Sequence, residues 1–185
     1  MNQRASGYAR VASDAYHTPA WVTKVLLKHI PEHIKTIWEP SSGADDMANV
    51  LTTKFDVFTT DIKQGENFLA YKESPETEIN AIITNPPYDF ATEFCHSALR
   101  MMKPRHGFVA MLLRIDFDSA KTRRDLFGNC GFFSGKLILL DRIKWFDDPD
   151  KKANRSYNHA WFIWSCIDNA YRKPQIYYAS KGDVE

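Results

Sequence analysis

Cysteine is scarce in this chain, with Cys95, Cys130 and Cys166 far apart among 185 residues. An odd number without Cys-x-x-Cys spacing argues against a disulfide framework and against a cysteine metal site. The sequence also lacks an apolar run of 18 residues, and its N-terminal segment lacks an apolar core. Membrane spanning and secretion are therefore not expected, and we predict a reduced, cytoplasmic protein without a bound metal.

An excess of charge of either sign is absent as well, since the formal net charge is +1. Any surface that binds a polyanion must therefore be a local patch. Apolar residues make up 44% and charged residues 25% of the chain, which is ordinary for a folded domain. The sequence has no internal repeat and no low-complexity linker. We predict one domain over residues 1–185, in which residues 1–15 form a polar, flexible N-terminal segment.

Short apolar runs alternate with segments of helical periodicity along the chain. The predicted strands are 34–39, 55–60, 79–84, 107–113, 136–140 and 159–166. The first predicted helix begins at Thr18-Pro19, and three others cover 47–53, 90–102 and 119–127. This alternation predicts an α/β fold with a mostly parallel central sheet, helices on both faces and an antiparallel edge strand from the final pair.

The motif Asn85-Pro86-Pro87-Tyr88 follows directly on the apolar run 79–84. The two prolines fix the backbone and remove N–H donors, so the carbonyls here are not drawn into a helix or a ladder. An amide, a free carbonyl and an aromatic face then lie at the carboxyl edge of a sheet, where open α/β folds bind ligands. This set suits an amino group on a flat ring; the alternative is a plain Pro-Pro turn capped by asparagine.

Acidic residues follow two earlier strands. Glu39-Pro40 leads into the small-residue turn 41–46, which contains Gly43, and Asp61 closes the next strand. A glycine turn before a helix lets a ligand approach the backbone, and its acidic neighbours favour a cationic or zwitterionic ligand. A carboxylate at the end of the second strand takes ribose hydroxyls in nucleoside-binding α/β folds, although such a residue is also a common surface cap.

The order Thr18-Pro19, Glu39-Pro40-x-x-Gly43, Asp61, Asn67-Phe68, Asn85-Pro86-Pro87-Tyr88 resembles that of class I S-adenosylmethionine-dependent methyltransferases that methylate amino groups. It is most similar to the short adenine-N6 DNA methyltransferases of phages and prophages, over about residues 16–166. The resemblance implies a Rossmann-like fold, S-adenosylmethionine as cofactor, and an enzyme of a bacterial or phage-infected cell. Protein-glutamine and some RNA methyltransferases share the Asn-Pro-Pro-Tyr motif.

The resemblance also implies roles for individual residues. The Asn85 side chain and the Pro86 carbonyl would accept hydrogen bonds from the target amine, with Pro87 completing the motif and Tyr88 stacking on the target ring. Residues implied in cofactor binding are Tyr16, Thr18, Pro19, Glu39, Pro40, Gly43, Asp61, Ile62, Asn67, Phe68 and, beside its catalytic role, Asn85. Two positions depart from the family: Asp45 replaces its second turn glycine, which implies a wider turn or weaker binding, and Asn67 replaces its usual aspartate.

Basic and aromatic residues interleave in the second half of the chain. Those that would contact a nucleic acid are Lys121, Arg123, Arg124, Arg142, Lys144, Trp145 and Phe146. The alternative is a solvated charged face, since acids lie among them. The expected partner is DNA, either a duplex with a flipped base or a single strand. No separate target-recognition domain fits the chain, so we expect brief recognition by loops, a partner subunit or an oligomer.

Two other functions remain open on the sequence. The first is N-methylation of RNA adenine or of a protein glutamine. The second is an inactive methyltransferase fold that serves as a binding subunit, which the substitution at Asp45 favours and the intact Asn85-Pro86-Pro87-Tyr88 opposes.

Overall fold

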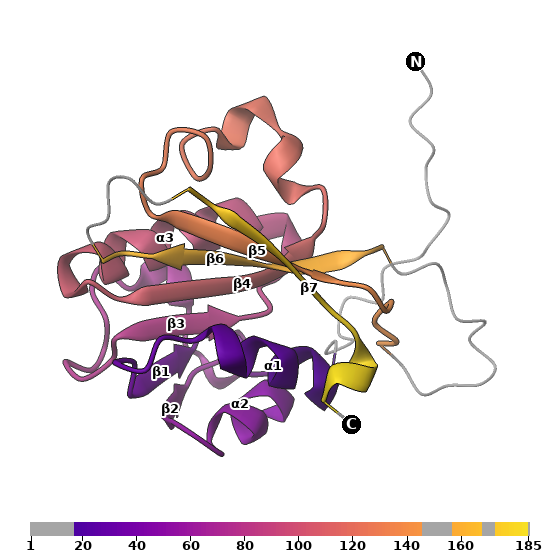
Figure 1. Cartoon of the computed structure of the whole chain (residues 1–185). Helices are drawn as coiled ribbons and strands as arrows, with labels where there is room; N and C mark the ends of the chain where they lie inside the picture. The colour runs from indigo at the N-terminus through magenta and orange to yellow at the C-terminus, as the bar shows by residue number, and fades with distance from the viewer. Residues whose placement is uncertain (1–16, 146–156, 168–172, 185) are drawn as a thin grey trace.

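One seven-stranded sheet forms the centre of the protein, with strand order β2-β1-β3-β4-β6-β5-β7 (Figure 1). The structure, a computed structural model, describes residues 17–145, 157–167 and 173–184. The strands are β1 Thr36–Glu39, β2 Asp56–Thr59, β3 Ala81–Thr84, β4 Phe108–Arg114, β5 Phe133–Leu139, β6 His159–Ser165 and β7 Gln175–Ala179. The six strands expected from the sequence are all present, and β7 is an addition.

The directions of the strands bring particular ends together. β2, β1, β3 and β4 are parallel neighbours, whereas β6 runs antiparallel between β4 and β5. The carboxyl ends of β1 to β4 therefore share one edge of the sheet with the amino end of β6. The register pairs Arg114, the last residue of β4, with His159, the first residue of β6.

The central strands are buried on both faces, as expected when helices cover both sides of a sheet. In β3, Ile82 belongs to one hydrophobic core, and Ala81 and Ile83 belong to the other. The helix α3 (Ala91–Met102) covers the first core, and α1 (Ala20–Leu26) and α2 (Asp46–Leu51) cover the second. The predicted mostly parallel α/β sheet with helices on both faces is confirmed, but its antiparallel strand is β6, which lies inside the sheet between β4 and β5, whereas the strand at that edge, β7, pairs in parallel.

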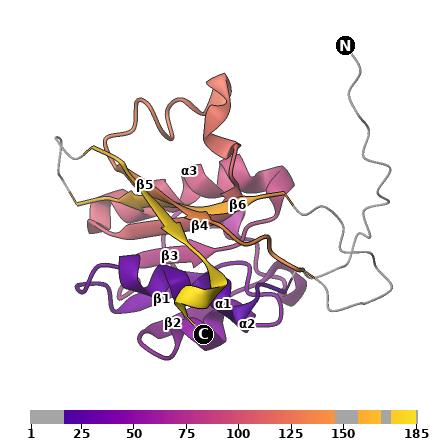
Figure 2. The same ribbon diagram turned by 45° about the vertical axis from the view of Figure 1, so that its right-hand side comes forward.

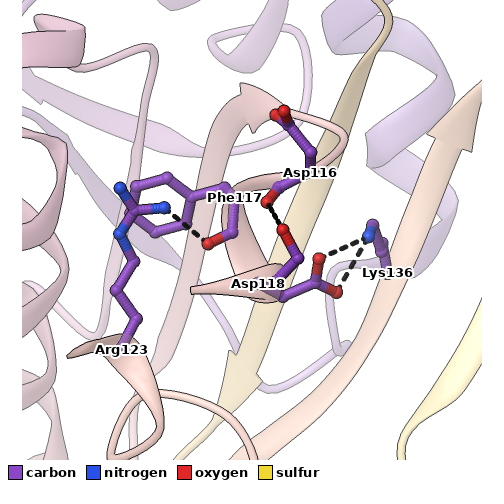
Figure 3. A network of polar contacts seen from close by, with 6 residues as sticks. Asp116, Phe117, Asp118, Arg123 and Lys136 are labelled. Carbon is purple, nitrogen blue, oxygen red and sulfur yellow. Dashed lines mark hydrogen bonds and ion pairs between the residues drawn. The ribbon is translucent and has the colours of Figure 1, made fainter. Parts of the chain in front are cut away.

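The connection from β4 to β5 differs from the expected helix over 119–127. It contains two short 3₁₀ helices, Phe117–Ser119 and Lys121–Arg123. Main-chain hydrogen bonds between residues three apart hold its turns, and side-chain contacts fasten it to the sheet (Figure 3). The Arg123 guanidinium lies 3.9 Å from the centre of the Phe117 ring and donates to the Phe117 carbonyl, and Lys136 Nζ donates to both carboxylate oxygens of Asp118 at 2.8 and 2.9 Å.

β7 was missed because its sequence, Gln-Ile-Tyr-Tyr-Ala, follows a short polar stretch and lies so near the chain end. It pairs in parallel with β5, and the 3₁₀ turn Lys181–Asp183 that follows it lies against α1 (Figure 2). Gly135 allows this close pairing, because a Cβ atom there would lie 2.5 Å from the Gln175 carbonyl oxygen. β7 thereby covers part of the core that α1 and α2 share.

Candidate active site

The turn after β1 is fastened to the end of β2. The Gly43 N–H donates to Asp61 Oδ2 at 2.9 Å, and the Ser42 N–H donates to the Thr60 carbonyl at 3.2 Å. Gly43 and Asp45 both adopt the left-handed conformation, with φ of 58° and 62°. The turn thus has two positions at which glycine is the favoured residue, and the one that the sequence occupies with Asp45 keeps the same backbone.

Replacing Asp45 by glycine is expected to stabilise the protein by about 1 kcal/mol, because it relieves a left-handed aspartate. No hydrogen bond is lost in exchange, since within the described part of the chain the Asp45 side chain makes no cap hydrogen bond to α2 and its buried Oδ1 has no partner. Urea unfolding monitored by circular dichroism measures the change. Asp46→Gly is the matched control: it places glycine inside α2 and removes the contact with His17 (2.6 Å), so it should destabilise.

Glu39, at the carboxyl end of β1, carries the most unusual carboxyl group of this edge. Its side chain is 2% exposed, and Oε2 has no hydrogen-bond partner among the described residues. Burial, followed by the negative charge of Asp45, raises its pKa well above the ordinary value, while the Ala48 main chain lowers it. A cationic group placed here would relieve both effects, so the pocket chemistry fits a sulfonium or ammonium ligand.

Glu39→Gln should therefore stabilise the ligand-free protein at neutral pH and weaken binding of a cationic ligand. Because the folded-state pKa of Glu39 lies above its unfolded value of about 4.5, the folded protein binds this proton more tightly. The stabilising contribution of the protonated Glu39 carboxyl is therefore present below about pH 4.5 and is lost as pH rises through the folded pKa. The variant should lack this loss, so its gain in free energy of unfolding over wild type should grow from pH 4.5 to pH 8, as urea unfolding at several pH values would show.

The next residues along the edge follow β2. Asp61 is 7% exposed, and its second oxygen accepts from the Lys63 N–H at 2.8 Å. Ile62 is 65% exposed, an unusual position for an isoleucine, and it can cover one face of a flat ligand. Asn67 caps the 3₁₀ helix Phe68–Ala70 through its own side chain. Phe68 is 2% exposed and packs in the core against Trp38.

Asn85 follows β3 at the same edge. Its Nδ2 donates to Thr18 Oγ1 at 3.3 Å, and Thr18 is 5% exposed just before α1. This contact turns the amide so that Oδ1, which is buried and has no partner among the described residues, is left as a free acceptor. Pro86 is buried, and the Pro87 carbonyl accepts from the Phe90 N–H at 2.9 Å, whereas Tyr88 is 41% exposed beside the site.

Two residues of this edge were missed in the sequence. Arg114 ends β4 and donates to Asp116 at 3.0 Å, and its guanidinium lies 3.7 Å from the centre of the Tyr157 ring. His159 begins β6 and stacks with Tyr88 at a ring separation of 5.8 Å. Burial lowers the pKa of His159 to about 4, the Tyr157 main chain raises it and Arg114 lowers it, so the imidazole is neutral. Only the antiparallel register of β6, which the sequence does not reveal, brings this histidine to the edge.

The basic and aromatic residues expected to contact a nucleic acid are divided by the structure. Arg142, Lys144 and Trp145 follow β5, whose carboxyl end lies at the edge of the site, and the two cations are exposed. Lys121 and Arg124 are also exposed, whereas Arg123 is partly buried in the contacts with Phe117 described above. Tyr16 and Phe146 lie outside the described residues.

Solved structures with similar folds include methyltransferases. Over 91% of its length the chain superposes on a type I restriction-modification methyltransferase subunit from Streptococcus thermophilus, with a TM-score of 0.57 and 13% identity. The fold is that of the class I methyltransferases. The type IIG restriction endonuclease BpuSI also matches, with a TM-score of 0.57, 8% identity and 86% of this chain. A putative RNA methyltransferase from Pyrococcus horikoshii matches over 85% of this chain and 92% of its own, with a TM-score of 0.50 and 13% identity.

These matches establish the methyltransferase fold alone, because each identity is below 25%. The chain spans 48% of the length of the Streptococcus thermophilus subunit and 25% of BpuSI. No family model matches the chain, and the curated proteins include no match. Within the described ranges, no helix is long and apolar enough to cross a membrane, and no cluster of three or more metal-ligating side chains was found.

Proposed function

We propose that the protein transfers the methyl group of S-adenosylmethionine to the exocyclic N6 amino group of adenine in DNA. The observation that carries this proposal is the orientation of the Asn85 amide. Thr18 Oγ1 accepts from Asn85 Nδ2, and the buried Oδ1, which is followed in the chain by Pro86-Pro87-Tyr88, has no hydrogen-bond partner among the described residues. An amine whose hydrogens are held by two acceptors is positioned with its lone pair directed outward, and Oδ1 with the Pro86 carbonyl forms such a pair.

The remaining edge residues suit S-adenosylmethionine, which supplies an electrophilic methyl group on a cationic sulfur. Glu39 and the turn with Gly43 would hold the methionine part, because a buried carboxylate whose Oε2 has no hydrogen-bond partner among the described residues fits a cationic ligand. Asp61 would bind the ribose hydroxyls. Ile62 would pack on the adenine, with Asn67 and the neighbouring Phe68 at its edge, and Thr18 and Pro19 would close the site from α1.

Asn85 and the Pro86 carbonyl would then orient the target amine, Tyr88 would stack on the target ring, and the exposed Arg142 and Lys144 would contact phosphates. A base in a duplex must leave the stack to reach this site. The similarity to a restriction-modification methyltransferase subunit supports DNA as the substrate, and the similarity to a putative RNA methyltransferase supports the alternative of RNA adenine.

The test is methyl transfer from labelled S-adenosylmethionine to unmethylated duplex DNA, followed by mass spectrometry of the nucleosides, with Asn85→Ala as control. N6-methyladenine that disappears in the variant supports the proposal. Label in RNA or in a protein glutamine, but not in DNA, would replace the substrate. Cofactor binding by calorimetry without transfer to any substrate would favour the inactive binding subunit.

A further inference from the structure

His159 is a buried polar side chain that the fold leaves unsatisfied. It is 2% exposed, and among the described residues neither Nδ1 nor Nε2 makes a hydrogen bond of ordinary distance and angle, although the Tyr157 main chain lies close to the ring. Buried polar atoms of folded proteins are nearly always paired, because an unpaired one keeps its full desolvation cost. Two unpaired nitrogens on one ring therefore require an explanation.

Aromatic packing alone does not supply that explanation. The Tyr88 ring stacks on the imidazole at 5.8 Å and 28°, and the Trp145 ring meets it edge-on at 5.3 Å and 83°. A phenylalanine could make both contacts without burying unpaired nitrogens. His159 is therefore better explained by a hydrogen-bonding ligand than by its neighbours.

The position of His159 indicates which ligand this is. Tyr88 belongs to the motif that begins with Asn85, and its ring contacts His159, which lies at the amino end of β6 beside the carboxyl end of β4. The imidazole is neutral, so it has one donor and one acceptor nitrogen. A neutral N–H donor suits an acceptor nitrogen of a heterocycle. A phosphate would be bound more strongly by a cation such as Arg142 or Lys144.

We propose that His159 reads the target ring by donating its N–H to a ring nitrogen beside the amino group that is methylated. This inference rests on the proposed function and deepens it. Adenine has such an acceptor on each side of its amino group, N1 and N7, whereas a glutamine side chain has none. His159 thus selects an amino-heterocycle over an amide, and Asn85 and His159 together fix the ring in its own plane.

Admission of the ring requires Tyr88 to turn. In the structure the Tyr88 ring lies on the imidazole, and its 41% exposure gives it room to move toward solvent. Once displaced, the Tyr88 ring can stack on the face of the target. The edge of the target can then approach a nitrogen of the imidazole in the plane of the imidazole ring.

The test compares His159→Phe, which keeps an aromatic ring, with His159→Asn, which keeps a neutral donor and acceptor. The substrates are a single-stranded oligonucleotide of adenines and the same oligonucleotide with 1-deazaadenine or 7-deazaadenine throughout. We expect His159→Phe to lower kcat/KM on adenine about tenfold, as for a lost hydrogen bond, and His159→Asn to recover most of it. One deaza substrate should cost the wild type about the same factor and cost His159→Phe little more, because the two changes remove one interaction.

His29→Phe is the matched control. His29 also has an unpaired, buried ring nitrogen and packs on an aromatic ring, that of Tyr177 at 4.6 Å, but it lies at the opposite end of α1 from Thr18. The His29→Phe variant should transfer methyl groups at the same rate as the wild type. Because His159→Phe no longer buries unpaired nitrogens, it should unfold at a temperature no lower than the wild type, which separates lost recognition from lost folding.

Equal rates for His159→Phe and the wild type, or additive losses with both deaza substrates, would overturn the reading role of His159 while leaving the methyltransferase activity in place. The absence of transfer by the wild type to any adenine oligonucleotide would overturn the proposed function and, with it, this inference.

Discussion

Alanine in place of Asn85 is expected to slow methyl transfer by a factor of about 10² to 10³ while leaving the affinity for S-adenosylmethionine nearly unchanged. The variant removes the Oδ1 acceptor that the contact with Thr18 leaves free. On the proposed function, that acceptor would orient the amine in the transition state and would contribute less to holding the cofactor. Single-turnover kinetics with calorimetry of cofactor binding separates the two effects.

The matched control for this prediction lies at the other end of the same strand. Asn80 precedes β3, and its Oδ1 accepts from the Lys35 and Thr36 N–H groups at 3.2 and 3.3 Å. Asn80→Ala should lower stability without changing the rate per folded molecule. Parallel losses of binding and rate in Asn85→Ala would contradict the catalytic role and make Asn85 a structural residue.

Alanine in place of Asp61 is expected to weaken cofactor binding by about 10- to 100-fold, the effect of losing hydrogen bonds to a charged group. The carboxylate accepts from the Gly43 N–H at 2.9 Å and from the Lys63 N–H at 2.8 Å, so it shapes the turn after β1 in addition to its proposed role toward the cofactor. Equilibrium binding measures the loss, and saturating cofactor should restore most of the rate.

Asp56 provides the comparison, since it is an exposed aspartate at the first position of β2, whereas Asp61 follows the last. Asp56→Ala should bind the cofactor as the wild type does. A loss of rate in Asp61→Ala that saturating cofactor does not restore would mean that Asp61 acts in the transfer step itself.

The side of the edge formed by β1, β2 and β3 was predictable from the sequence because each of its polar residues lies at or just after the end of a strand. The parallel strands β1, β2 and β3 each end in a polar residue or motif, and parallel neighbours place those ends together. Glu39, Asp61 and Asn85 could therefore be placed at one edge before the fold was known. The left-handed conformation of Asp45 was not predictable, since aspartate is rarely required there.

The target side could not be predicted in the same way. His159 reaches the edge only because β6 runs antiparallel beside β4, and its apolar sequence is typical of any buried strand. The same holds for the β4–β5 connection, where Arg123 packs on Phe117 and Asp118 pairs with Lys136. Such contacts join residues whose meeting depends on the whole fold.

The position of β6 between β4 and β5 also has a consequence for synthesis on the ribosome. β4 and β5 are made first, but neither pairs with the other; both wait for residues 159–165. Until then the edge of β4, one of the most apolar strands, has no partner, and open edges of this kind invite aggregation. The parallel half of the sheet can assemble early, whereas the strand that brings His159 is inserted late. A pause or a destabilising substitution in β6 should therefore reduce the yield of folded protein more than an equal change in β2.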